Sequence, residues 1–153
     1  MSGFRLSTTP ALAALALGAV QAAEKEYCDW EVDNFAVQQP LCGLQGDAKR
    51  GRTVALNRSK GNCLACHQMP IPEEDFHGNL APPLNSVGAR YDPGQLRARV
   101  VDIKQINPNS LMPSFYKHPD NLNRVSEKFR GKTVLTAQEV EDVVVYLSTL
   151  KQE

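Results

Sequence analysis

The most specific chemistry in this sequence lies at positions 63–67, which read Cys-x-x-Cys-His. This pattern is the attachment signature of c-type haem, in which two thiols add to the haem vinyl groups and the adjacent histidine binds the iron. A thioredoxin-like motif would need strand–helix alternation around it, and a zinc site would need a second ligand pair with zinc-type spacing, and both are absent here. We therefore predict one covalently attached haem c, with Cys63 and Cys66 as attachment residues and His67 as an axial iron ligand.

The sixth iron ligand must come from elsewhere in the chain. An electron-transfer haem commonly uses methionine there. Met69 follows the proximal histidine too closely to reach the opposite haem face, whereas Met112 lies far downstream in an irregular segment, 107–113, that holds two prolines. Such a rigid extended segment can direct a thioether sideways. We predict Met112 as the sixth ligand; His118 and His77 are alternatives that would give a bis-histidine haem.

The two remaining cysteines, Cys28 and Cys42, lie 14 positions apart near the N-terminus. A disulfide between them would close a loop whose loss of chain entropy contributes about 3 kcal/mol to stability. The alternatives are a second redox-active thiol pair and a bond to another chain.

The first residues have the form of an export signal. A short start with Arg5 is followed by an apolar stretch over 10–20 and by small residues that end at Ala22. The apolar stretch is about half the ~20 residues that a membrane-spanning helix needs. We predict a signal peptide over 1–22, an N-terminal extension over 23–44, and a main domain over 45–153. Export to the periplasm would place the cysteines in an oxidising compartment, and no other segment is expected to cross a membrane.

The composition suits a small neutral domain. The 153 residues carry 17 basic and 17 acidic side chains, a balance that argues against nucleic-acid binding. Aromatic residues make up only 7%, so the side chains alone provide a modest core. A covalent haem would supply the missing apolar centre.

The helix signals predict an all-α fold. Asp47 is a good N-cap for a helix over roughly 48–60, and Gly51 within it predicts a close helix crossing. A second helix is expected from Pro93 to about 106, where an Asn-Pro pair stops it. The clearest helix follows Thr136, which begins a capping box, and extends to about 150.

The order of these features resembles the class I cytochromes c, and their detail resembles the SoxX family of mono-haem cytochrome subunits. The similarity covers about 40–150. The segments that carry it are Gly61 to Pro70, Gly88 to Tyr91, Ile106 to Pro108 before Met112-Pro113, and Leu135 to Leu147. It implies a class I cytochrome c fold in which Pro82 or Pro83 accepts the ring N–H of His67, and Tyr146 packs on Gly51.

The resemblance also implies a function and partners. SoxX-like chains form a heterodimer with a SoxA-like cytochrome subunit, and the pair acts as an L-cysteine S-thiosulfotransferase in thiosulfate oxidation. The sulfur chemistry belongs to SoxA, which couples thiosulfate to a carrier cysteine on SoxYZ. This chain would then take up the electrons and pass them to a small soluble cytochrome c. A free-standing periplasmic cytochrome c is the alternative. Phe115 and Tyr116, close to Met112, are expected to pack on the haem; the alternative is that they lie at an interface with a partner.

Overall fold

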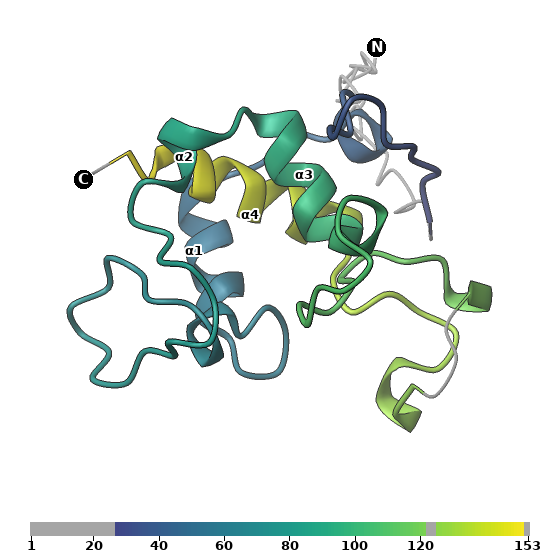
Figure 1. The fold of residues 1–153 in the computed structure, drawn as a ribbon. Helices are drawn as coiled ribbons and strands as arrows, with labels where there is room; N and C mark the ends of the chain where they lie inside the picture. The colour runs from purple at the N-terminus through teal and green to yellow at the C-terminus, as the bar shows by residue number, and fades with distance from the viewer. Residues whose placement is uncertain (1–26, 122–124, 152–153) are drawn as a thin grey trace, which may run out of the picture.

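A computed structural model describes residues 27–121 and 125–151; the predicted signal peptide over 1–22 lies outside these residues. The described part of the chain is helical and holds no named strand, with one isolated β-bridge between Asp33 and Ala36. Four α-helices form its frame (Figure 1): α1 (Ala48–Leu56), α2 (Val87–Arg90), α3 (Pro93–Asp102) and α4 (Ala137–Thr149). One short 3-10 turn precedes α1, at Leu41–Gly43, and others lie between the helices, at Cys63–Ala65, Ile103–Gln105, Pro119–Asn121 and Glu127–Phe129. This confirms the predicted all-α class.

The predicted helix starts are confirmed by their caps. The side chain of Asp47 accepts the N–H of Arg50 at the start of α1. Asp92 and Thr136 each form a complete capping box, at the first turns of α3 and α4. These caps satisfy backbone N–H groups that have no partner inside the helix, which is why the local sequence alone locates them.

Two helix ends differ from the prediction, and α2 was not predicted at all. Helix α1 ends at Leu56 rather than near 60. The N–H of Asn57 bonds to the carbonyls of Thr53 and Val54, and the N–H of Gly61 returns to Val54 at 3.3 Å. The chain therefore folds back toward the start of the Cys-x-x-Cys-His segment instead of continuing the helix. Regular α3 ends at Asp102 and continues as one 3-10 turn.

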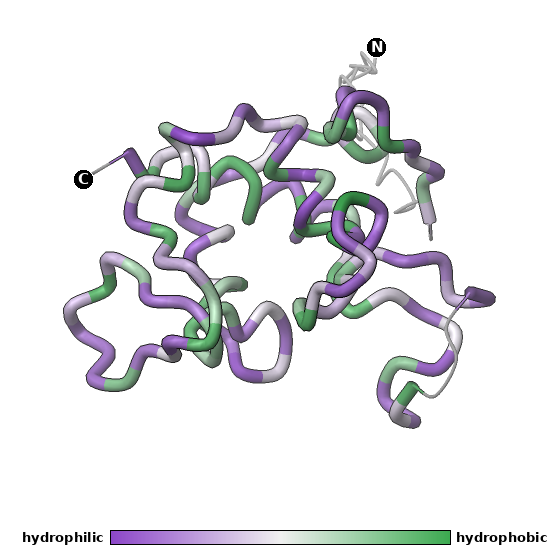
Figure 2. The backbone as a smooth tube through the Cα atoms, in the orientation of Figure 1, coloured by the Kyte–Doolittle hydropathy of each residue, from purple (hydrophilic) through white to green (hydrophobic). Residues whose placement is uncertain are grey.

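Helix α4 is the centre of the fold, because it packs on α1, α2 and α3. Its central turns are hydrophobic along the chain (Figure 2), and Val140, Val143 and Val144 are fully buried. At the crossing with α1, a Cβ added to Gly51 would lie 1.9 Å from the carbonyl oxygen of Asp142 and 2.9 Å from Tyr146 Cβ. The predicted close crossing, with Tyr146 against Gly51, is confirmed.

The N-terminal segment, residues 27–44, packs onto the helices. Val37 and Leu41 belong to the buried core. The N–H of Leu41 donates to Glu141 Oε1 at 2.9 Å, and Arg97 donates to the carbonyl of Val37 at 2.7 Å. Arg97 and Glu141 also form a buried ion pair at 2.8 Å, with both side chains almost fully excluded from solvent. One ion pair thus joins α3, α4 and the N-terminal segment.

Candidate haem site

The Cys-x-x-Cys-His motif folds as a tight turn that follows α1. A 3-10 helix covers Cys63–Ala65, preceded by Asn62 in the left-handed region at φ 48°. The N–H groups of Cys66 and His67 both bond to the carbonyl of Cys63, at 3.2 and 2.9 Å. The turn places two free thiols and the histidine within five residues, and neither cysteine is in a disulfide.

Burial raises the pKa of the Cys63 thiol to about 11, and the neighbouring Cys66 adds to the rise. This thiol is therefore protonated at neutral pH until it is alkylated. Burial also raises the pKa of Tyr146; the nearby Cys63 acts in the same direction, and the positive charge of Arg52 opposes the rise. The ring that packs on the helix crossing thus lies beside the attachment turn.

His67 is already oriented by the protein. Its Nδ1–H donates to the carbonyl of Pro82 at 2.7 Å. This bond fixes the tautomer and leaves Nε2 as the nitrogen able to bind a metal, the usual arrangement behind a ligating histidine. Of the two prolines expected to accept this bond, the structure selects Pro82, because the carbonyl of Pro83 accepts from Arg90 at 2.9 Å.

The loop that brings Pro82 to His67 is tied back to the attachment turn. Gly78 N–H donates to Leu64 at 2.7 Å, and Ala81 N–H donates to Cys66 at 3.0 Å. A Cβ added to Gly78 would lie 2.2 Å from the carbonyl oxygen of Ala65. Only glycine permits this approach. The sequence alone does not reveal this role of Gly78, because an isolated glycine in a loop carries no local signal of close packing.

Met112 lies in the irregular segment after α3, partly buried and packed against the core. Its carbonyl accepts from Lys104 Nζ at 2.6 Å, and its N–H donates to Ser110 Oγ at 3.2 Å. The backbone of Met112 is therefore held by two side chains, and its role as the sixth ligand stays a prediction.

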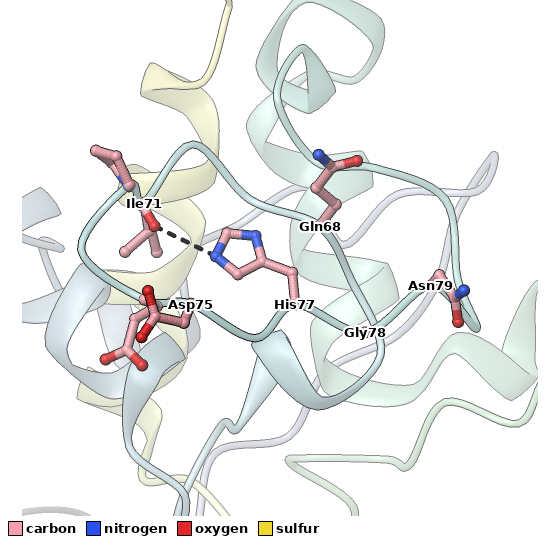
Figure 3. A pocket seen from close by; sticks show the side chains of 8 residues that line it. Gln68, Ile71, Asp75, His77, Gly78 and Asn79 are labelled. Carbon is pink, nitrogen blue, oxygen red and sulfur yellow. Dashed lines mark hydrogen bonds between the residues drawn. The ribbon is translucent and has the colours of Figure 1, made fainter.

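The two alternative histidines make other contacts. Both ring nitrogens of His77 bond within its own loop: Nδ1 accepts from the N–H of Met69 at 3.3 Å, and Nε2 donates to the carbonyl of Ile71 at 3.2 Å (Figure 3). His118 lies edge-on to the ring of Tyr27, with centroids 4.6 Å apart. His77 therefore acts as a brace for its loop, and it lines a surface pocket together with Glu74 and Asp75 (Figure 3).

Tyr116 is held by the N-terminal segment, and its expected contact with haem stays a prediction. Tyr116 is 1% exposed, and its ring stacks on Tyr27 with centroids 5.0 Å apart. Its hydroxyl accepts the N–H of Cys28 at 2.8 Å, and its carbonyl accepts from Trp30 at 3.1 Å. Its partners lie almost ninety positions earlier, so no local pattern reveals them. Phe115 is also buried, and its contact with haem stays a prediction.

Cys28 and Cys42 are joined by a disulfide, with their Cα atoms 5.6 Å apart. The bond closes the N-terminal segment into a loop directly beside Tyr116. Within the described ranges, no group of three or more His, Cys, Asp or Glu side chains is placed to hold a metal ion.

Comparison with known proteins identifies the class. The cytochrome c family model matches residues 48–151, and the chain belongs to that family. A chain in the crystal structure of SoxXA from P. pantotrophus superimposes with a TM-score of 0.73 at 37% identity, covering 80% of this chain and 95% of that one. Within the family the chain is accordingly SoxX-like. A search of curated sequences finds no match.

Membership of this family means that the chain carries a covalently bound haem c. The residues present fit that group. Two free thiols lie on one turn. In the neighbouring His67, Nδ1 is bonded to the carbonyl of Pro82, and Nε2 is available to bind iron. Partly buried apolar residues that pack against the core also offer apolar surface to a porphyrin, among them Leu84, Ile106 and Met112.

Proposed function

We propose that this chain is the electron-transfer subunit of a SoxXA-like complex, with haem c attached at Cys63 and Cys66 and its iron held between His67 and Met112. The observation that carries the proposal is the 2.7 Å bond from His67 Nδ1 to Pro82, which prepares the histidine for iron. The chain that makes this bond shares 37% sequence identity with a SoxXA chain, which favours this subunit over other cytochromes.

The chain's own residues perform three tasks at this site. The thiols of Cys63 and Cys66 form thioethers, which anchor the group, and Pro82 holds the His67 ring in one tautomer. Met112 closes the second axial position, so that small molecules are kept from the iron. The bound haem supplies a one-electron couple. Such a site favours electron transfer over substrate binding.

The proposed reaction divides between subunits. Joining a carrier cysteine thiolate on SoxYZ to thiosulfate forms one sulfur–sulfur bond and releases two electrons. All four cysteines of this chain are committed, two to a disulfide and two to the attachment turn, so none remains to hold sulfur. The sulfur step would then belong to a SoxA-like partner. This chain would accept the electrons one at a time and pass them to a small soluble cytochrome c.

Export is part of the proposal. We assign 1–22 to a signal peptide and the remaining chain to the periplasm, where haem attachment and the Cys28–Cys42 disulfide are both compatible with the oxidising environment. Over the described ranges, no helix has the length and hydropathy required to cross a bilayer.

The partner assignment is tested by co-expressing the full chain, carrying a C-terminal tag, with a SoxA-like subunit and the haem attachment machinery. The two chains are expected to co-purify in equal amounts and to reduce a soluble cytochrome c when supplied with thiosulfate and the SoxYZ carrier. A matched preparation lacking the SoxA-like subunit should give no reduction. Purification of this chain alone, with full competence to exchange electrons with respiratory complexes, would favour the free-standing cytochrome instead.

The axial ligand is tested by two volume-conserving variants. Met112→Leu should lose the weak near-infrared sulfur-to-iron charge-transfer band of the ferric protein and gain carbon monoxide binding when reduced. Met69→Leu is the matched control, since Met69 is 3% exposed and packs in the core. It should keep the band. Retention of the band in Met112→Leu would show that another residue binds the iron.

A further inference from the structure

The segment that carries Met112 is held by hydrogen bonds to two side chains, one in the 3-10 turn after α3 and one within the segment itself. Lys104 Nζ donates to the carbonyl of Met112 at 2.6 Å, and Met112 N–H donates to Ser110 Oγ at 3.2 Å. The segment contains no helix or strand, so side-chain hydrogen bonds hold its backbone in place of the regular backbone hydrogen bonds of such an element. The position of the thioether therefore depends on the residues that make them.

Asp102 is the centre of this arrangement. It is 1% exposed and sits where α3 gives way to the 3-10 turn. Its carboxylate accepts the hydroxyl of Ser114 at 2.6 Å, the N–H of Lys104 at 3.2 Å and the side-chain amide of Gln105 at 3.3 Å. It thus connects directly to a residue two positions after Met112 and to the residue that holds the Met112 carbonyl.

The carboxylate is held in its charged form. Burial alone acts to raise the pKa of Asp102, but the hydrogen bonds from Ser114, Gln105 and Lys104, with the charge of Lys117, hold it below its ordinary range. A buried carboxylate with three donors aimed at it is costly to rearrange, because any displacement leaves a charge without its partners.

The chain beyond Ser114 is also fixed on α3. Phe115 N–H donates to the carbonyl of Val100 at 3.3 Å, and Tyr116 N–H donates to Val101 at 3.1 Å. Leu135 N–H in turn donates to the carbonyl of Phe115 at 3.0 Å. Backbone bonds therefore anchor the chain directly after Ser114. Asp102 bonds to Ser114 itself, which lies between this anchor and Met112 in the sequence.

We propose that Asp102, acting through Ser114 and Lys104, is a positioning residue that holds the Met112 thioether against the haem iron. The inference rests on the proposed role of Met112 as sixth ligand and deepens it. The hydrogen bonds of Asp102 go to Ser114, Lys104 and Gln105, so it acts on Met112 through its neighbours. Its effect is on the equilibrium between bound and released Met112, and hence on how readily another ligand displaces the methionine.

The test uses the ferric holoprotein and imidazole as the competing ligand. Imidazole is titrated while the near-infrared charge-transfer band is followed, since loss of the band reports displacement of Met112. Ser114→Ala removes one hydrogen bond to a carboxylate and so weakens the hold on Met112. Because imidazole competes with Met112 for the iron, its apparent binding should become about tenfold tighter. Asp102→Asn removes the charge that all three donors face, and should give at least the same increase.

Two control variants separate positioning from general loosening. Ser114→Thr keeps the hydroxyl and should restore the wild-type affinity for imidazole within about twofold. Ser148→Ala removes a partly buried hydroxyl that donates to Val144 at 2.8 Å within α4, far along the chain, and should also match the wild type. The Ser114 variants decide the question even when Asp102→Asn does not fold.

Wild-type affinity for imidazole in Ser114→Ala, with the band intact in the wild type, overturns the positioning role and leaves the proposed function standing. An equal increase in Ser148→Ala overturns it as well, because the effect would then be general. Absence of the band from the wild type overturns both the ligation by Met112 and the role of Asp102.

Discussion

Replacing Gly51 by alanine probes the crossing of α1 and α4 that supports the attachment turn. The added Cβ would lie 1.9 Å from the carbonyl oxygen of Asp142, whereas ordinary contact begins near 3.4 Å. The helices must therefore separate by about 1.5 Å, since backbone atoms at a packed crossing cannot step aside as a flexible side chain can. Tyr146, which lies across from the glycine, would move with α4.

The energy follows from two opposing effects. Overpacking of this severity costs about 3 kcal/mol, the upper end of its usual range. Alanine is better than glycine inside a helix by about 1 kcal/mol, which offsets part of the cost. We expect a net loss of about 2 kcal/mol, which for a domain of this size lowers Tm by about 8 °C.

The assay is thermal unfolding of the holoprotein followed by far-ultraviolet circular dichroism. Gly94→Ala is the matched control: it also lies in a helix, but its added Cβ would be 3.2 Å from the nearest atom, the carbonyl oxygen of Val37. It should stay within about 1 kcal/mol of the wild type, because a shift of a few tenths of an ångström suffices. Equal stability of Gly51→Ala and the wild type would refute the argument from the crossing.

Three further outcomes are expected. Serine at Cys28 and Cys42 should cost about 3 kcal/mol in urea unfolding, and reducing the wild type should give the same loss. Hydrogen bonds, chiefly from Arg50, hold the pKa of Asp142 below its usual value despite burial, so its contribution is complete above about pH 4 and lost on acidification; Asp142→Asn should flatten that part of the stability–pH curve. Glu141→Gln should cost about 3 kcal/mol, since Arg97 stays buried without its counter-charge, and the double variant Arg97→Met, Glu141→Leu should recover part of this in the same assay.

The sequence by itself determined the features whose partners are close along the chain. Cys-x-x-Cys-His is chemically complete within five positions, so the attachment turn could be predicted from residue types alone. The starts of α3 and α4 are equally local, because each capping box closes over three residues at Asp92 and Thr136. Gly51 indicated a close crossing because glycine inside a helix needs a packing reason.

The tertiary structure alone decided which distant groups meet. The carbonyl of Pro82, rather than that of Pro83, receives the His67 ring, because the loop returns through Gly78 against the attachment turn. The predicted helix runs past Asp102 to about 106, so the sequence gives this residue no special role, yet folding buries it among donors from both sides of the Met112 segment. Such groups are selected by the cost of burying a polar atom without a partner, and that cost exists only once the chain has folded.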